Sequence, residues 1–354
     1  MPSILSKAVL TILSVIVALY IGEISVRSLG LGHPAERSLL FSSPTWQQDS
    51  RNAIRYLPNR KIRTVAVYDG NIEYDIQFHT NNLGFIDHVD YARDAVSSRK
   101  HYAFVGDSFT AGYHGGEPWV PRLRERVRGQ NIGIYNLGID GTGVEHFSRL
   151  LKSAGQQVSF TTIVIVAISN DFRRDYWYPQ VQGDDISFCH ETAGPPDCGR
   201  VARIIPHDSP VVEIQKIAKQ VADDKKEVKS IFKQSQLLAL FKQTQRNLFG
   251  RSVYSKKNVE HSLLSLKKIR DAFPAAEIHL VHLPQKEEVV MGAYLLDFGK
   301  RMEETGVQYF PALQRCHWSE DMFFKHDAHP NSAGYKNISS CVSNYLFKSQ
   351  GRSD

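Results

Sequence analysis

A serine lies where a short apolar run gives way to a turn. The run 102–105 is followed by Gly106, Asp107 and Ser108. If the run is a buried strand, the Ser108 hydroxyl lies exposed at its carboxyl end, and the glycine allows a substrate to approach closely. A nucleophilic serine needs this placement. The same residues could instead cap a helix, because serine and aspartate are preferred at helix N-termini.

Two later segments carry groups that could donate hydrogen bonds to an oxyanion. The segment 136–141 supplies a flexible backbone whose N–H groups could point at an oxyanion, and Asn170 offers a side-chain amide after the run 162–168. Acyl transfer needs two or three such donors, and losing one costs about 2.7–4 kcal/mol of transition-state stabilisation. Taken singly, each segment is more often a strand-ending turn or a helix cap than an oxyanion donor.

An aspartate and a histidine stand together near the C-terminus. A serine hydroxyl is too weak an acid to attack an ester unaided, so it needs an imidazole as base and a carboxylate to hold that imidazole in one tautomer. His329 and Asp327 fit these two roles. The alternatives are a surface histidine with a capping aspartate, or a metal site formed by His326, Asp327 and His329. We expect neither a metal nor another cofactor, because no further ligand pair at helical spacing accompanies them.

The elements that must position these residues follow from the hydrophobic pattern. From residue 101 onward, short apolar runs alternate with amphipathic stretches, which predicts a parallel sheet covered by helices on both faces. Right-handed crossovers then place all strand carboxyl ends at one edge, where such sheets build their sites. The expected strands cover 102–105, 132–136, 162–168, 278–283 and 307–310, and the expected helices cover 117–128, 143–154, 258–273, 290–304 and 332–347.

Two stretches stand outside this alternation. Residues 60–86 alternate apolar and polar side chains around Asp69-Gly70, which predicts a type I′ hairpin in a small β-rich lead-in. Residues 172–257 separate the third and fourth strands, and we expect a cap there: an aromatic, cysteine-bearing loop followed by helical sequence over 211–249. The lysines and arginines of the cap indicate a solvated face, with contact to anionic headgroups or an acidic glycan as the alternative.

Taken in order, the four reactive segments resemble the sequence blocks of the SGNH (GDSL) hydrolase superfamily. Gly106-Asp107-Ser108 is similar to the first block, and the segments 136–141, 169–171 and 327–331 are similar to the later ones. The resemblance extends over residues 101–348. Four blocks in the family's own order indicate the family far more specifically than any single block does.

This resemblance implies a fold and a set of roles. The fold is a flavodoxin-like three-layer α/β/α sandwich with a mainly parallel five-stranded sheet. The implied catalytic residues are Ser108 as nucleophile, His329 as base and Asp327 as the acid that orients the base. The implied oxyanion hole consists of the Ser108 N–H, the Gly141 N–H and the Asn170 amide.

Two positions depart from the usual pattern of the family. Ile168 stands where the third block ordinarily opens with glycine, and His326 stands where the acid ordinarily lies, three residues before the histidine. Asp327, two residues before the histidine, is the expected acid, and a backbone carbonyl or a distant aspartate is the alternative. Membrane-anchored, polysaccharide-modifying branches are similar in using this spacing, and the segment 80–85 looks like one that precedes the first block in those branches.

The N-terminus of this 354-residue chain is apolar. Residues 8–22 carry no charge and have further apolar residues on both sides, which favours an uncleaved signal anchor. A cleaved signal peptide and a buried helix of a soluble protein are the alternatives. The balance of 43 Lys and Arg against 37 Asp and Glu gives a net charge of +6, which falls short of the concentrated basic stripe of a nucleic-acid binder.

Four cysteines are too few for a disulfide scaffold. Cys189 and Cys198 bracket a loop rich in glycine and proline, while Cys316 and Cys341 lie in the C-terminal region. Two disulfides are therefore plausible in an exported protein, and four buried free thiols are the alternative.

We therefore expect a signal anchor over 1–30, a β-rich lead-in over 31–100 and a hydrolase domain over 101–348 that contains the cap. The resemblance implies a serine esterase, and the apolar N-terminus leads us to expect that it is tethered to the inner membrane by a single helix and faces the periplasm. The expected substrate is an O-acetyl or other short acyl ester of a polysaccharide or a lipid. The alternatives are an O-acyltransferase acting on an envelope polysaccharide, a lipase or thioesterase, and a non-catalytic polysaccharide-binding scaffold.

Overall fold

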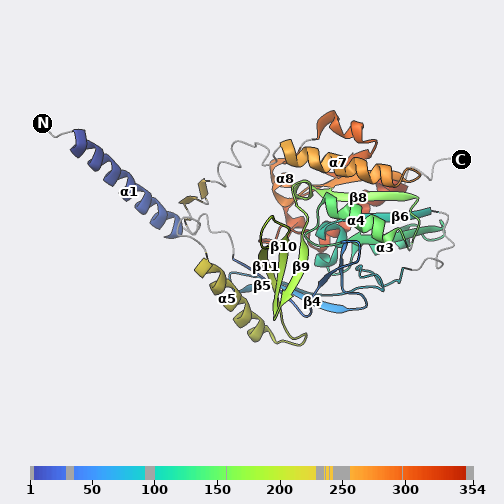
Figure 1. The fold of residues 1–354 in the computed structure, drawn as a ribbon, viewed down its shortest axis with the longest axis horizontal. Coiled ribbons are helices and arrows are strands. Elements are labelled where there is room, and N and C mark those ends of the chain that lie inside the picture. The colour runs from blue at the N-terminus through green and yellow to red at the C-terminus, as the bar shows by residue number, and fades with distance from the viewer. Residues whose placement is uncertain are drawn as a thin grey trace.

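The computed structural model of the chain describes residues 4–28, 36–91, 100–156, 158–228, 235, 237–238, 240–241, 256–296 and 298–347, and a five-stranded parallel sheet lies at its centre (Figure 1). The sheet order is β13-β12-β8-β6-β7, which is the flavodoxin-like order. All five strands expected from the apolar runs are confirmed. They span Lys100–Gly106 (β6), Ile132–Gly138 (β7), Thr162–Ile168 (β8), Glu277–Leu283 (β12) and Gln308–Pro311 (β13).

Helices cover both faces of this sheet, because alternate side chains of its strands point to opposite sides. Phe104 packs with α3 and α10 on one face, and Val105 packs with α4 and α7 on the other. The result is the expected three-layer sandwich. The four helices span Trp119–Arg126 (α3), Val144–Ala154 (α4), Lys256–Ala272 (α7) and Ser332–Phe347 (α10), close to four of the expected ranges.

The prediction of one helix over 290–304 is wrong. In its place α8 covers Lys286–Met291 and the 3₁₀ helix η4 covers Gly299–Thr305. Gly292 ends α8 in the left-handed region with φ of 66°, a conformation that terminates helices and favours glycine. The remaining short helices are Ser108–Ala111 (α2), Tyr113–Gly115 (η1), Ser169–Phe172 (η2), Ala312–Arg315 (α9) and Glu320–Met322 (η5).

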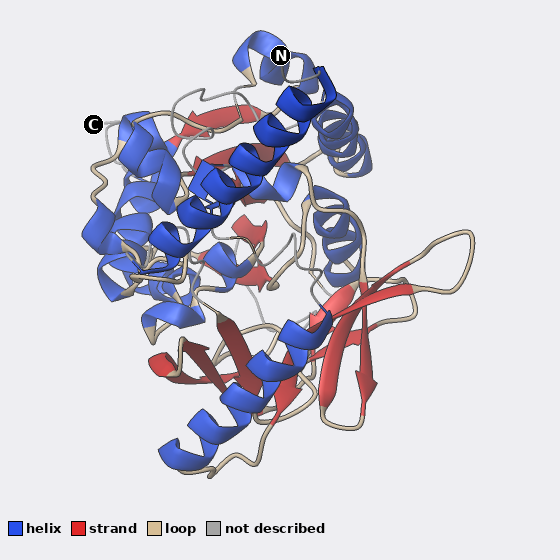
Figure 2. Cartoon of the chain, turned by 90° about the vertical axis from the view of Figure 1, so that its left-hand side faces the viewer, coloured by secondary structure: helices blue, strands red, loops and turns tan. Residues whose placement is uncertain are grey.

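A second sheet, of six strands, joins two stretches that are far apart in the chain and lies to one side of the helix-covered sheet (Figure 2). Its order is β5-β4-β1-β11-β10-β9, and the parallel pair β1–β11 connects the lead-in to the cap through Leu40 and Arg203. The strands are Arg37–Phe41 (β1), Lys61–Tyr68 (β4), Asn71–His79 (β5), Tyr178–Gln182 (β9), Asp185–His190 (β10) and Asp197–Ile204 (β11). The prediction of a loop at the start of the cap is therefore wrong, because β9, β10 and β11 form there.

The tip of the β4–β5 hairpin confirms the expected type I′ turn, because Asp69 and Gly70 both have positive φ, 47° and 80°. A separate two-stranded ribbon is formed by β2 (Trp46–Gln48) and β3 (Ile54–Tyr56). The helix expected over 211–249 is present as α5 (Val211–Val228), and most of the remainder of that range lies outside the described residues.

One hydrophobic core runs through both sheets. Phe41 and Phe78 of the lead-in belong to the same buried cluster as Val105 of the central sheet and Ile186 of the cap. The ring of Phe78 lies 4.5 Å from that of Tyr113, just beyond the first block. The lead-in and the cap therefore pack directly against the end of the sheet that carries the reactive residues.

The first helix stands apart from this core. Helix α1 (Ile4–Ser28) projects from the body of the protein (Figure 1). Its window Val9–Val26 has a mean hydropathy of 2.2 and is only 6% buried, so it is long and apolar enough to cross a membrane. Both expected cysteine pairs form disulfides. Cys189 is joined to Cys198 across β10 and β11, and Cys316 is joined to Cys341 between the end of α9 and α10.

Candidate active site

Ser108 begins α2 at the carboxyl end of β6. Asp107 caps this helix, because its side chain accepts a hydrogen bond of 2.8 Å from the Phe109 N–H. A Cβ atom at Gly106 would lie 2.0 Å from Thr110 Oγ1 and 2.1 Å from the Val166 carbonyl oxygen, so only glycine fits there. The tight turn leaves Ser108 at the carboxyl edge of the sheet, with 5% of its surface exposed.

Three of the predicted residues form a hydrogen-bonded relay. The Nε2 atom of His329 lies 2.7 Å from the Oγ of Ser108, and the Nδ1 atom of His329 contacts the Oδ1 of Asp327. The backbone N–H of His329 also donates to that carboxylate, at 3.1 Å. Because the carboxylate accepts at Nδ1, that nitrogen carries the proton, and Nε2 is left to accept the proton of the serine.

The second oxygen of Asp327 is held by the lead-in sheet. It accepts hydrogen bonds from the hydroxyls of Tyr68, at 2.9 Å, and Tyr74, at 3.4 Å, and lies 3.6 Å from the guanidinium of Arg37. Burial by itself would raise the pKa of Asp327, but the neighbouring His329 and Arg37 outweigh it and hold that pKa well below its usual range. Asp327 is therefore a buried, ionised acceptor.

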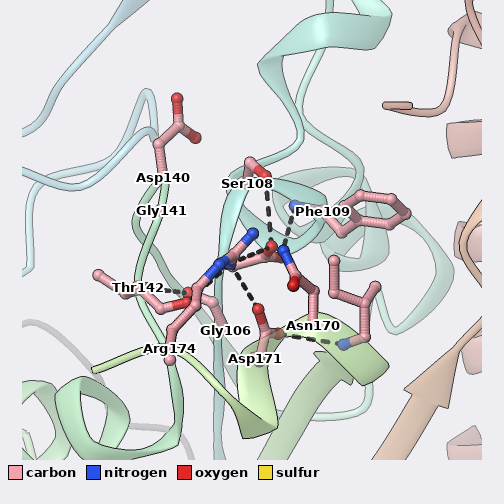
Figure 3. A network of polar contacts seen from close by, with 12 residues as sticks. Gly106, Ser108, Phe109, Asp140, Gly141, Thr142, Asn170, Asp171 and Arg174 are labelled. Carbon is pink, nitrogen blue, oxygen red and sulfur yellow. Dashed lines mark hydrogen bonds and ion pairs between the residues drawn. The ribbon is translucent and has the colours of Figure 1, made fainter. Parts of the chain in front are cut away.

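The two predicted oxyanion donors come from the ends of β7 and β8. Figure 3 places Gly141 and Asn170 beside Ser108, at the same end of the sheet. Gly141 adopts φ of 74°, and its carbonyl accepts a 3.0 Å hydrogen bond from Trp177 Nε1. The Oδ1 of Asn170 accepts from Arg173, which leaves the amide NH₂ turned toward the serine.

A single arginine ties three of the strand ends together (Figure 3). One terminal nitrogen of Arg174 lies 2.8 Å from Asp107, 2.5 Å from Asp171 and 2.9 Å from the carbonyl oxygen of Thr142. Burial, and then the nearby Asp107, raise the pKa of Asp171, whereas Arg174 lowers it. The arginine therefore balances two fully buried carboxylates directly beneath Ser108.

A second group of serine, histidine and carboxylate lies behind the site and has no access to solvent. The hydroxyl of Ser169 lies 3.0 Å from His282 Nε2 and 2.5 Å from Glu288 Oε1, and all three residues are 0% exposed. Burial raises the pKa of Glu288 to about 6 and lowers that of His282 to about 3. Glu288 accepts from the N–H of Gln285, whose side chain accepts from the N–H of Asn170, so this cluster positions the amide donor.

The metal alternative is not supported by the placement of His326. Its ring is turned toward Glu73, at 3.6 Å, and stacks on Tyr68. Across the part of the chain that the structure describes, no group of three or more His, Cys, Asp or Glu residues could hold a metal ion.

The sequence patterns missed every residue that supports the relay from outside the four blocks. Arg37, Tyr68 and Tyr74 belong to the lead-in sheet, and Trp177 and Arg174 to the beginning of the cap. Most of their partners lie far from them in the chain: 259 residues separate Tyr68 from Asp327, 67 separate Arg174 from Asp107, and 36 separate Trp177 from Gly141. The pair of Arg174 and Asp171, three residues apart, is the local exception among these contacts. The one usable signal was the acidic pair Asp107 and Asp171, since two buried carboxylates require a cation.

Part of the chain matches a known protein family. Residues 102–190 match the GDSL-like Lipase/Acylhydrolase family. The matched segment begins at β6 and ends in β10, so it contains the serine, both oxyanion candidates and Arg174. A search of curated proteins finds no match.

Solved structures resemble the chain at low identity. A lipase/acylhydrolase from Enterococcus faecalis is 13% identical, with 70% of this chain and 95% of that chain covered and a TM-score of 0.32. A GDSL-like lipase from Bacteroides thetaiotaomicron is 12% identical, with coverages of 71% and 89% and a TM-score of 0.33. A two-domain esterase active on acetylated mannans is 13% identical, with coverages of 72% and 50% and a TM-score of 0.35. At these low values, none of them defines an activity for this chain.

Proposed function

Since residues 102–190 match the GDSL-like Lipase/Acylhydrolase family, we propose that the chain is a membrane-tethered serine esterase of the SGNH/GDSL superfamily that cleaves a short acyl ester through an acyl-enzyme intermediate. The single observation that carries this proposal is the relay of Ser108, His329 and Asp327, with 2.7 Å between the hydroxyl oxygen and the imidazole nitrogen. This spacing lies within the hydrogen-bond reach that a general base requires.

The first half of the reaction acylates the serine. Ser108 Oγ attacks the ester carbonyl carbon while His329 Nε2 takes the hydroxyl proton, which yields a tetrahedral oxyanion and an imidazolium paired with Asp327. The tetrahedral intermediate then collapses. The bond between the carbonyl carbon and the alcohol oxygen breaks, His329 returns its proton to that oxygen, and the alcohol departs.

The second half repeats the same steps with water. His329 removes a proton from a water molecule, the resulting hydroxide attacks the acyl carbon, and Ser108 leaves with the proton that His329 gives back. The N–H groups of Ser108 and Gly141 and the amide of Asn170 stabilise the oxyanion in both halves. Asp327 remains ionised throughout, because Tyr68, Tyr74 and Arg37 hold its second oxygen.

We assign the acyl group as short, acetyl being the simplest case. Phe188 of the cap packs against Gly141 so closely that a Cβ atom there would lie 2.9 Å from its ring, and Trp177 stacks on Phe188 at 3.6 Å. This aromatic bulk beside an oxyanion donor favours a small acyl group over a long chain. We propose an O-acetylated polysaccharide of the cell envelope as the natural substrate, and hydrolysis rates against acyl esters of increasing length test the assignment.

The proposed nucleophile can be tested by covalent labelling. A fluorophosphonate probe is expected to modify the wild-type protein at Ser108 and to leave Ser108→Ala unlabelled, because only an activated serine attacks phosphorus at a useful rate. Mass spectrometry of the labelled peptide is the measurement, and Ser187→Ala, on β10, is the matched control. A well-folded wild-type protein that remains unlabelled would instead indicate a binding scaffold without turnover.

The lead-in sheet is expected to contribute to catalysis through Asp327. Replacement Tyr68→Phe removes one hydroxyl donor and is expected to lower kcat/KM for an acetyl ester by about 10-fold, since hydrogen bonds to charged groups are the stronger ones. Tyr345→Phe is the matched control, because its hydroxyl bonds His279 at 2.8 Å at the opposite end of the central sheet. Equal rates for the Tyr68 and Tyr345 variants would show that the contact is not used.

We propose that α1 anchors the protein in the inner membrane with the catalytic domain in the periplasm. Two disulfides support an oxidising compartment. Glu23, within the apolar window, accepts hydrogen bonds from Ser235, at 2.8 Å, and from the Leu237 N–H, at 2.9 Å, which offset part of the cost of a carboxylate at the bilayer edge.

An alkaline phosphatase fusion after residue 40 tests the orientation. Since alkaline phosphatase is active only when exported, we expect an active fusion that remains in the membrane fraction. An inactive fusion that is stably produced would contradict export, and an active fusion found only in the soluble fraction would indicate a cleaved signal peptide.

A further inference from the structure

A second imidazole lies flat against the proposed base. The ring of His114, in η1, is 3.8 Å from the ring of His329 with only 8° between their planes. The opposite face of His114 is covered by its neighbour Tyr113, whose ring is 4.0 Å away at 24°. His329 therefore lies at the end of a stack of three rings.

His114 is held in its neutral form. It is 3% exposed, and its Nδ1 atom has no hydrogen-bond partner among the described residues. Burial, and then the proximity of His329, keep the pKa of His114 well below its ordinary value. A buried polar atom without a partner costs stability, and such exceptions in a folded protein need a functional or structural reason.

The two hydrogen bonds of His329 leave one motion of its ring unrestrained. Ser108 and Asp327 bind nitrogens at opposite sides of the ring, so they fix the axis through these two atoms. They do not prevent the ring from tilting about that axis. A flat ring in van der Waals contact with one face of the imidazole opposes this tilt.

We propose that His114 is a positioning residue for the proposed reaction: its neutral ring keeps the His329 imidazole in the plane shared by Ser108 and Asp327, and its π face stabilises the imidazolium formed at each proton transfer. An aromatic face attracts a cation stacked on it. A second charged imidazole in this position would repel the imidazolium, so the buried, neutral state of His114 is essential to the role. The inference rests on the proposed esterase function.

The test is the pH dependence of kcat/KM for an acetyl ester in four proteins: wild type, His114→Phe, His114→Leu and His114→Gln. The acid limb of this profile reports the pKa of the base in the free enzyme. We expect the phenylalanine variant, which keeps a ring, to stay within about 3-fold of wild type. We expect the two ringless variants to lose about 10- to 100-fold, as small misplacements near reacting atoms do.

The acid limb separates stacking from ordinary packing. Without an aromatic face the imidazolium is less stable, so the limb of the ringless variants is expected to lie lower by about 0.5 pH unit. The other titratable or charged groups around the two rings are the same in all four proteins. Among the described residues they include Arg37, Tyr68, Glu73, Tyr74, Asp107, Tyr113, Asp140, Asp327 and Tyr335. His101→Leu, at the amino end of β6, is the control and should match wild type in rate and limb.

Two results would overturn the inference. One is wild-type rates in the folded ringless variants. The other is an equal loss in all three His114 variants with an unmoved acid limb, which would mean that the site needs only the packed volume. Two ringless variants are used so that one poorly folded protein, recognised by its circular dichroism, does not decide the outcome. If wild type itself neither labels with fluorophosphonate nor hydrolyses the ester, the proposed function fails instead.

Discussion

Replacing His329 by alanine is expected to lower kcat/KM for an acetyl ester by about 10⁴-fold or more. The imidazole is the only base within 3 Å of Ser108 Oγ among the described residues, and the serine hydroxyl cannot lose its proton at neutral pH without one. The residual rate should equal that of Ser108→Ala, because removing either residue of a cooperating catalytic pair abolishes the rate enhancement that the pair produces together. Steady-state kinetics on the two single variants and the double variant is the measurement.

Asp327→Ala is expected to retain more of the rate than His329→Ala, because the carboxylate orients the base without reacting itself. His317→Ala provides the control for a histidine outside the relay. Full activity of the His329 variant would contradict the assigned base, and additive losses in the double variant would show that the two residues do not act together.

Arg174→Met is expected to destabilise the fold by about 3–5 kcal/mol, the usual effect of breaking a buried ion pair by removing one partner. The substitution keeps much of the side-chain volume but leaves Asp107 and Asp171 facing each other in the interior without a cation. Urea unfolding monitored by circular dichroism measures the loss. Arg122→Met is the control, since Arg122 forms an exposed pair with Glu117 that should contribute about 0–1 kcal/mol.

The loss of folding stability in the Arg174→Met variant should be larger at alkaline pH than at mildly acidic pH. Burial and Asp107 already raise the pKa of Asp171, and removing Arg174 raises it further. A carboxyl group whose pKa is higher in the folded state favours folding at low pH, and this contribution is lost as the pH rises through the folded pKa. The variant should therefore lie closer to wild type in mildly acidic buffer than at alkaline pH. A deficit that grows on acidification would contradict the role of the two carboxylates.

Local sequence patterns were sufficient to predict the strands of the central sheet. Each of its strands is built around a short run rich in β-branched or aromatic residues, as is typical of buried parallel strands, so the runs ending at Val105 and Ile168 could be recognised from the local sequence alone. The helix expected over 290–304 failed because the apolar spacing continued past Gly292, while the backbone of that glycine turned left-handed and ended α8. The three cap strands were missed because few of their side chains are fully buried, which weakens the alternation on which strand prediction depends.

What the amino-acid sequence by itself determined is the set of candidate reactive groups, because Ser108, Asn170, Asp327 and His329 each follow a short segment whose type and order are visible in the chain. Only the tertiary structure decided which groups surround them. The parallel pair of β1 and β11 assembles one sheet from the lead-in and the cap, and that sheet places Tyr68 and Tyr74 on Asp327. The physical reason is that contacts between residues 253 and 259 positions apart depend on packing across the whole molecule, which no local pattern of hydrophobicity or turn chemistry encodes.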